Sequence, residues 1–133
     1  KRFEELEQLI LSIDDGLKAV ITSNVCTKES ERISVINYVE YLNEEQIIVD
    51  NAGLMCINFV RKLGASNILL AGFDGFSAQC SDNYYEEKMV FDVDEERLQN
   101  MNEAFSRKIL QIRRGTEIKF LTESIYDNGG ENA

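Results

Sequence analysis

The sequence contains no histidine, no proline and no tryptophan, and only three of its 133 residues are cysteine. Histidine is the usual proton shuttle near neutral pH, so its absence excludes Ser-His-Asp and Cys-His sites and histidine-ligated metals within this chain. Catalysis here would have to rest on carboxylates, Lys, Tyr or Cys, or on a partner domain. The composition therefore excludes several functions and assigns none.

Positive charge is also scarce, with 14 Lys and Arg against 24 Asp and Glu and a net charge of −10. Proteins that bind nucleic acid gain affinity by neutralising phosphates with Lys and Arg, so this balance predicts no nucleic-acid partner. The same charge disfavours an anionic membrane surface. No apolar stretch approaches the roughly 20 residues that span a bilayer, so we expect no membrane partner.

The three cysteines, Cys26, Cys56 and Cys80, are widely spaced and form no CxxC pair. Zinc and thioredoxin-like sites therefore have no support. Cys56 lies inside an apolar run, which predicts a small buried residue. An odd number of dispersed cysteines suits a reducing compartment, and no signal peptide is evident, so we expect a cytoplasmic protein.

The length predicts one domain, because ~100–200 residues usually form one. We place a single domain at residues 1–126 and regard residues 127–133, DNGGENA, as a polar tail. The chain begins with Lys1 rather than Met, which suggests a fragment of a longer protein.

Hydrophobic periodicity predicts the order helix, strand, strand, helix, strand, helix, strand. The expected ranges are 3–14, 19–24, 33–42, 50–64, 68–73, 94–114 and 117–122. Alternating strands and helices favour parallel βαβ units. We therefore expect an α/β fold, a three-layer Rossmann-like domain with a mostly parallel sheet of four to five strands. The unbroken apolar run at 68–73 predicts a central strand covered on both faces.

Polar and glycine residues follow two of the predicted strands, where ligands of open α/β sheets bind. The candidates on this rim are Ser23, Asn24, Gly72, Asp74, Gly75 and Ser77. Two interpretations of Asp74 remain open. Its carboxylate could accept hydrogen bonds from sugar hydroxyls beside two flexible glycines, or Asp-Gly could simply form a turn after a buried strand.

Asp50 and Asn51 open a predicted helix and complete the set of rim candidates. Free amides at a helix start can bind an anion, and a plain N-cap is the alternative. Neither GxGxxG nor GxxxxGK[ST] occurs, so known phosphate-binding loops are absent. Tyr84 and Tyr85 lie in a strongly acidic stretch; they could stack on a base or sugar, or cover an interface.

Two segments carry a resemblance to a known family. They are DNAGLMCINFVRKLGASNILLAGFDGFS, at residues 50–77, and NYYEEKMVFDVDEERLQNMNEAFSRKI, at residues 83–109. Together they resemble the C-terminal domain of bacterial aldolase-like proteins found with surface-polysaccharide genes. Those proteins carry an N-terminal TIM barrel of the hydroxymethylglutaryl-CoA lyase and 4-hydroxy-2-oxovalerate aldolase type. The resemblance covers about residues 19–122 and is sharpest at 50–53 and 72–75.

The resemblance implies that the aldol chemistry and its divalent metal belong to a barrel outside this chain. This chain would then be an accessory, non-catalytic domain without a cofactor, and its partner would be its own N-terminal barrel. The turn at 72–75 also resembles Rossmann-like domains of bacterial sialyltransferase-like proteins, which handle nucleotide sugars, although the absent histidine departs from that pattern. Two alternatives stay open: a module that binds a nucleotide or nucleotide sugar, and an interaction domain that docks the barrel or a second copy as a homo-oligomer.

Overall fold

The computed structural model describes residues 8, 12, 18–25, 30–77 and 94–127. The chain divides into two compact units, with the boundary between Leu42 and Asn43. Each unit is described by itself.

The first unit contains a pair of short parallel strands, β1 (Ala19–Thr22) and β2 (Ile33–Ile36). After β2 the chain enters a 3-10 helix, η1 (Tyr38–Tyr41), which begins at the N-cap Asn37. The Asn37 side chain accepts a hydrogen bond from the Val39 amide. The predicted strand at 33–42 is therefore right only in its first half, because an Asn side chain offers the backbone a local partner that competes with a strand ladder.

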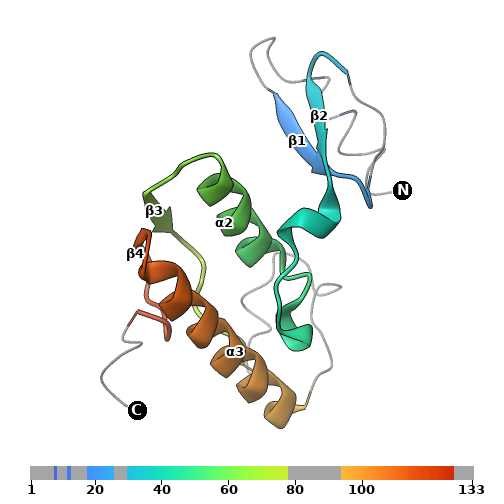
Figure 1. The fold of residues 1–133 in the computed structure, drawn as a ribbon. Coiled ribbons are helices and arrows are strands. Elements are labelled where there is room, and N and C mark those ends of the chain that lie inside the picture. The colour runs from blue at the N-terminus through green and yellow to red at the C-terminus, as the bar shows by residue number, and fades with distance from the viewer. Residues whose placement is uncertain (1–7, 9–11, 13–17, 26–29, 78–93, 128–133) are drawn as a thin grey trace. The chain divides into compact units, whose positions relative to one another are not determined.

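The second unit contains two α-helices and a second pair of parallel strands among its described residues. Its elements are η2 (Gln46–Ile48), α2 (Ala52–Lys62), β3 (Asn67–Leu70), α3 (Glu95–Arg113) and β4 (Glu117–Phe120). β3 and β4 pair in parallel with α3 between them in the chain, which is a βαβ unit (Figure 1). The parallel direction of this pair agrees with the prediction from strand–helix alternation.

Side-chain caps determine where both helices begin. The Oδ1 atom of Asn51 accepts a hydrogen bond from the Leu54 amide at 3.0 Å and so caps α2. The Oδ1 atom of Asp94 accepts the Arg97 amide at 2.7 Å and caps α3. α2 ends before Gly64, whose φ of +96° is the left-handed conformation typical of a helix stop. Both helices lie close to their predicted ranges because their capping residues are explicit in the sequence.

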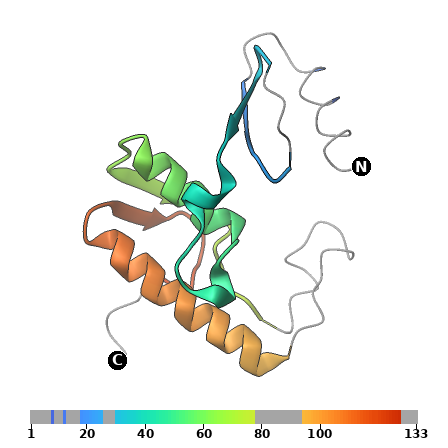
Figure 2. The same cartoon turned by 45° about the vertical axis from the view of Figure 1, so that its right-hand side comes forward.

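The core of the second unit lies between one face of the β3–β4 pair and the two helices (Figures 1 and 2). It consists of Ile48, Leu54, Ile57, Leu70, Ala104, Phe105, Ile109, Ile112, Ile118 and Tyr126. Burying one such Leu, Ile or Phe side chain contributes roughly 1.5–3 kcal/mol. α3 supplies four members of this core, which are Ala104, Phe105, Ile109 and Ile112.

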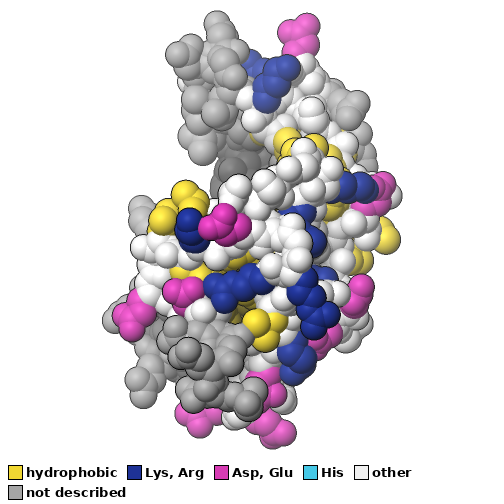
Figure 3. Space-filling model, turned by 60° about the vertical axis from the view of Figure 1, so that its left-hand side comes forward, with side chains coloured by type: hydrophobic (Ala, Val, Ile, Leu, Met, Phe, Trp, Pro, Cys, Tyr) yellow, Lys and Arg dark blue, Asp and Glu magenta, His cyan; other side chains and the backbone are white. Residues whose placement is uncertain are grey.

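The outer face of the β3–β4 pair is open. Leu69 is 62% exposed, and Leu121, just after β4, is 65% exposed. Hydrophobic side chains reach the surface beside charged ones on the side of the molecule where β3 and β4 lie (Figure 3). The expectation that 68–73 forms a strand covered on both faces is therefore wrong for Leu69.

The predicted fold class is wrong. The described residues form two separate two-stranded parallel sheets and two α-helices, and no three-layer sheet of four to five strands is present among them. Strand–helix alternation predicts that neighbouring strands run parallel. It does not determine whether two strand pairs share one sheet, because that depends on backbone hydrogen bonds between residues far apart in the sequence.

Cys56 is exposed rather than buried. It lies on α2 opposite the buried residues Leu54, Met55 and Ile57, because residues two apart in a helix point in different directions. Because the α2 sequence is apolar nearly throughout, its hydrophobic pattern did not indicate which face of the helix is exposed.

Several predictions lie outside the described residues. They concern most of the helix at 3–14, the acidic stretch at 78–93 with Tyr84 and Tyr85, and the tail at 128–133. Among the helices that the structure does describe, none is both long and apolar enough to cross a membrane.

Candidate functional site

The carboxyl ends of β3 and β4 continue into two adjacent loops, residues 71–77 and 121–127. The Leu121 amide donates to the Leu70 carbonyl at 2.7 Å and extends the strand pairing by one bond. Further along, the Ile125 amide donates to the Asp74 carbonyl at 3.3 Å. The predicted rim is therefore a pair of mutually bonded loops.

Thr122 connects Gly72 and Asp74 of the first loop. Its Oγ1 atom accepts the Gly72 amide at 2.9 Å and donates to Oδ1 of Asp74 at 3.3 Å. The φ angle of Gly72 is +72°, which lets the chain turn back toward Thr122. The Asp74 side chain thus bonds to the neighbouring loop and remains exposed to solvent.

Close packing restricts the second half of the same turn. Gly75 has a φ of +118°, and a Cβ atom there would lie 2.6 Å from Cδ1 of Ile125. The Ser124 hydroxyl donates to the Phe73 carbonyl. A ligand that approached the backbone of this turn would need the space beside it. The loop after β4 occupies that space through Ser124 and Ile125.

Asn102 of α3 anchors both loops to the core. Its Oδ1 accepts the Phe76 amide at 2.8 Å and its Nδ2 donates to the Phe76 carbonyl at 2.8 Å. The Tyr126 hydroxyl also donates to Asn102 Oδ1, at 2.7 Å. Burial raises the pKa of Tyr126 far above its ordinary value, although a backbone hydrogen bond with Phe76 acts in the opposite direction. Sequence analysis missed Asn102, and its only signal was an Asn in a helix interior, where Asn is disfavoured.

The start of α2 lies against this turn. A Cβ atom on Gly53 would be 2.8 Å from Cζ of Phe73, so the backbone of the helix touches that ring. Asn51 acts as a plain N-cap, and Asp50 is exposed just before it. The segments at 50–53 and 72–75 are therefore in contact with each other.

Two of the remaining rim candidates lie in the other unit, and one lies at the end of the first loop. Ser23 and Asn24 belong to the first unit, where the Ser23 Oγ accepts the Tyr38 amide at 3.0 Å and Asn24 is exposed. Ser77 is the last described residue of its loop and is exposed. Gly72, Asp74 and Gly75 are neighbours in the chain, and the tertiary contact that the structure adds is the one between Gly53 and Phe73.

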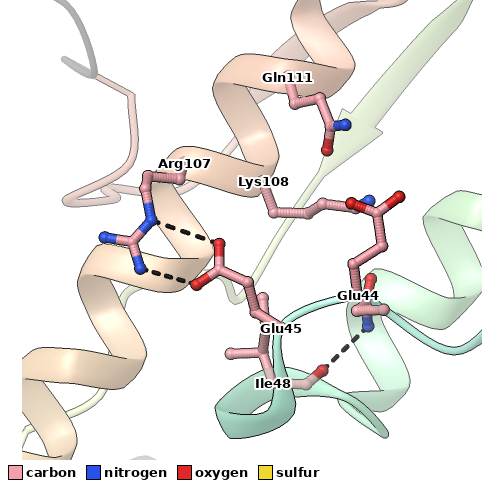
Figure 4. A pocket seen from close by; sticks show the side chains of 7 residues that line it. Glu44, Glu45, Ile48, Arg107, Lys108 and Gln111 are labelled. Carbon is pink, nitrogen blue, oxygen red and sulfur yellow. Dashed lines mark hydrogen bonds and ion pairs between the residues drawn. The ribbon is translucent and has the colours of Figure 1, made fainter.

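A cavity of about 260 Å³ lies elsewhere in the second unit, beside η2 and α3 (Figure 4). Its lining residues are Asn43, Glu44, Glu45, Ile48, Arg107, Lys108 and Gln111. Sequence analysis did not predict this cavity, because its two walls are about sixty residues apart in the chain.

A bidentate ion pair between Arg107 and Glu45 lies at one side of the cavity. The Arg107 Nη2 and Nε atoms donate to the two carboxylate oxygens of Glu45 at 2.7 and 3.3 Å. This hydrogen bonding holds the pKa of Glu45 below its ordinary value and raises the pKa of Arg107. The charge of nearby Lys108 lowers the pKa of Glu45 further.

Buried amide contacts hold the other wall in place. Asn43 is 4% exposed, and its Nδ2 donates to the Ile48 carbonyl at 3.0 Å. Its Oδ1 accepts a hydrogen bond from Nδ2 of Asn58 on α2 at 3.2 Å. The segment that carries Glu44 and Glu45 is therefore tied to the helix beside it.

The sequence matches no protein-family model and no curated protein, and the fold matches no solved structure. Within the described ranges, no three Cys, Asp or Glu residues are grouped so that they could hold a metal ion.

Proposed function

We propose that this chain is a non-catalytic accessory domain of an aldolase-like lyase whose catalytic barrel lies elsewhere in the parent protein. The observation that carries the proposal is the bonding between the loops at 71–77 and 121–127. In α/β enzymes this edge of the sheet presents side chains to a ligand. Here Thr122, Ser124 and Asn102 bond to the backbone of the first loop instead.

The packing of the resembling segments supports the same role. The segments at 50–53 and 72–75 touch through Gly53 and Phe73. A glycine is needed where a ring lies against the backbone, so the sharpest part of the resemblance has a packing explanation. A packing role for these residues is consistent with an accessory domain that carries no catalytic group of its own.

The open face of the β3–β4 pair supports a docking role toward the barrel. Parallel strands in α/β proteins are normally covered on both faces, whereas Leu69 and Leu121 are mostly exposed here. Lys119 and Glu117 lie on the same face and form an ion pair at 2.9 Å. An apolar patch with a balanced charge pair suits contact with another protein surface.

An activity assay of this chain tests the non-catalytic role. We expect no release of pyruvate from 4-hydroxy-2-oxo acids when the chain is supplied with Mn²⁺ or Mg²⁺. Release above the metal-only blank that scales with chain concentration would overturn the proposal.

A binding measurement tests the docking role. We expect the barrel encoded upstream in the same gene, expressed separately, to bind this chain. The double variant Leu69→Glu, Leu121→Glu should weaken that binding at least about tenfold, because it charges an apolar contact. Leu110→Glu, which charges an exposed leucine on α3, is the matched control and should bind normally. Equal binding by the double variant, or an upstream sequence without a barrel, would contradict the proposal.

A further inference from the structure

The cavity beside η2 and α3 involves none of the loop residues discussed under the proposed function. Pockets for drug-sized ligands usually measure ≈ 300–1,000 Å³. A volume of about 260 Å³ therefore suits a smaller molecule. Ile48 is the one apolar residue in its lining and is almost fully buried, so polar and charged side chains form most of the cavity wall.

The charges around the cavity are balanced and of two kinds. Arg107 and Glu45 neutralise each other through their two hydrogen bonds. Lys108 and Glu44 come from opposite walls and their charged ends point toward each other (Figure 4). Neither forms an ion pair or a side-chain hydrogen bond within the described part of the chain. The ammonium group of Lys108 and the carboxylate of Glu44 thus line the cavity without an ion-pair partner in the described part of the chain.

We propose that this cavity binds a small zwitterion of the α-amino-acid class. The ligand carboxylate would pair with Nζ of Lys108, and its ammonium group would pair with the carboxylate of Glu44. The Gln111 amide lies on the α3 wall and offers both a donor and an acceptor to further polar groups. A ligand with only one charge would gain one partner and meet one like charge, whereas a zwitterion satisfies both walls.

A ligand comparison tests the charge requirement. The chain is titrated by calorimetry with each of the twenty protein amino acids at millimolar concentration. The best binder is then compared with the amine that lacks its carboxylate and the acid that lacks its amino group. We expect both single-charge analogues to bind at least about tenfold more weakly, since each loses one charged hydrogen bond. An absence of binding across the panel, or equal binding by either analogue, would overturn the proposal.

Matched variants test the two assigned residues. Lys108→Gln and Glu44→Gln should each weaken binding at least about tenfold. Arg97→Gln and Glu123→Gln remove the same charges from exposed positions outside the cavity and should bind as the parent chain does. Unchanged affinity in both cavity variants would contradict the assignment. The side-chain amide signal of Gln111 provides a check in the unaltered chain, because it should shift in NMR spectra on saturation with the amino acid and stay unchanged if binding occurs elsewhere.

Discussion

Tyr126 stacks on Phe105, with ring centroids 4.5 Å apart and 23° between the ring planes. Tyr126 is only 2% exposed, although it lies in the loop after β4. The stacked pair therefore joins that loop to the middle of α3. It also places the Tyr126 hydroxyl on Asn102, which in turn holds Phe76.

Removing the Tyr126 hydroxyl should destabilise the second unit modestly. Tyr126→Phe keeps the stacked ring and deletes one hydrogen bond to Asn102, so we expect a loss of about 1 kcal/mol in the free energy of unfolding. Urea denaturation at neutral pH measures this difference. A variant as stable as the parent chain would mean that this hydrogen bond contributes nothing.

The raised pKa of Tyr126 predicts a loss of stability in alkali. Its folded-state pKa lies above the ordinary 10.0, so the unfolded chain releases the phenolic proton first. The contribution of this group is fully present below about pH 10 and declines as the pH rises, by at most ~1.4 kcal/mol per unit. The difference in unfolding free energy between the parent chain and Tyr126→Phe should shrink across this range. A constant difference would show that the pKa is not raised.

Asn102→Ala should be more damaging than Tyr126→Phe. It leaves both backbone groups of Phe76 and the Tyr126 hydroxyl without their partner, which predicts a loss of about 2–4 kcal/mol. Asn100→Ala on the same helix is the control. Asn100 is exposed, and Ala has the better helix propensity, so the substitution should be neutral or stabilising by up to about 0.7 kcal/mol. Thermal or urea unfolding measures both variants. Similar losses of stability in the two would show that the hydrogen bonds of Asn102 have no special role.

The turn at Gly75 should not tolerate a side chain. Gly75→Ala forces a φ of +118° on alanine and places its Cβ atom 2.6 Å from Ile125. We expect a loss of about 1–3 kcal/mol in stability. Gly115→Ala introduces the same methyl group where nothing lies within 4 Å, and should be neutral or stabilising by up to about 1 kcal/mol. Denaturant unfolding of the pair gives the comparison, and a neutral Gly75→Ala would refute the packing argument.

The ion pair at the cavity predicts a small acid-dependent effect. Arg107 lowers the folded-state pKa of Glu45 below 4.5, so the pair contributes stability above that pH and loses it as the pH falls through the folded-state pKa. Arg107→Gln should therefore be less stable than the parent chain near neutral pH and approach it in acid. The effect should be weak and salt-sensitive, since both side chains are substantially exposed. Equal stability of Arg107→Gln and the parent chain at low salt and neutral pH would contradict this prediction.

Local patterns in the sequence predicted α2 and α3 well. Asn51 and Asp94 carry side chains that suit helix starts, and Leu98, Phe105 and Ile112 repeat at helical spacing in α3. These signals involve residues a few positions apart, so they can be recognised without knowledge of any tertiary contact. Asn37 shows the limit of such patterns, because one capping side chain ended a strand that β-branched residues favoured.

The candidate sites depended on contacts between distant residues. The glycines around Asp74 predicted a turn or a ligand site, but nothing near them in sequence indicated Thr122 or Asn102 as partners. The cavity has the same origin, since Glu44 and Lys108 face each other only because η2 packs on α3.

The sequence by itself determined that no histidine-based chemistry occurs in this chain, where α2 and α3 begin, and that β3 and β4 run parallel around α3. Only the tertiary structure decided that the strands form two separate pairs, that the loops after β3 and β4 bond to each other, and that opposite charges line a cavity. Composition and helix capping depend on residue types at short spacing. Sheet pairing and site geometry depend on which distant groups satisfy each other's hydrogen bonds when the core closes.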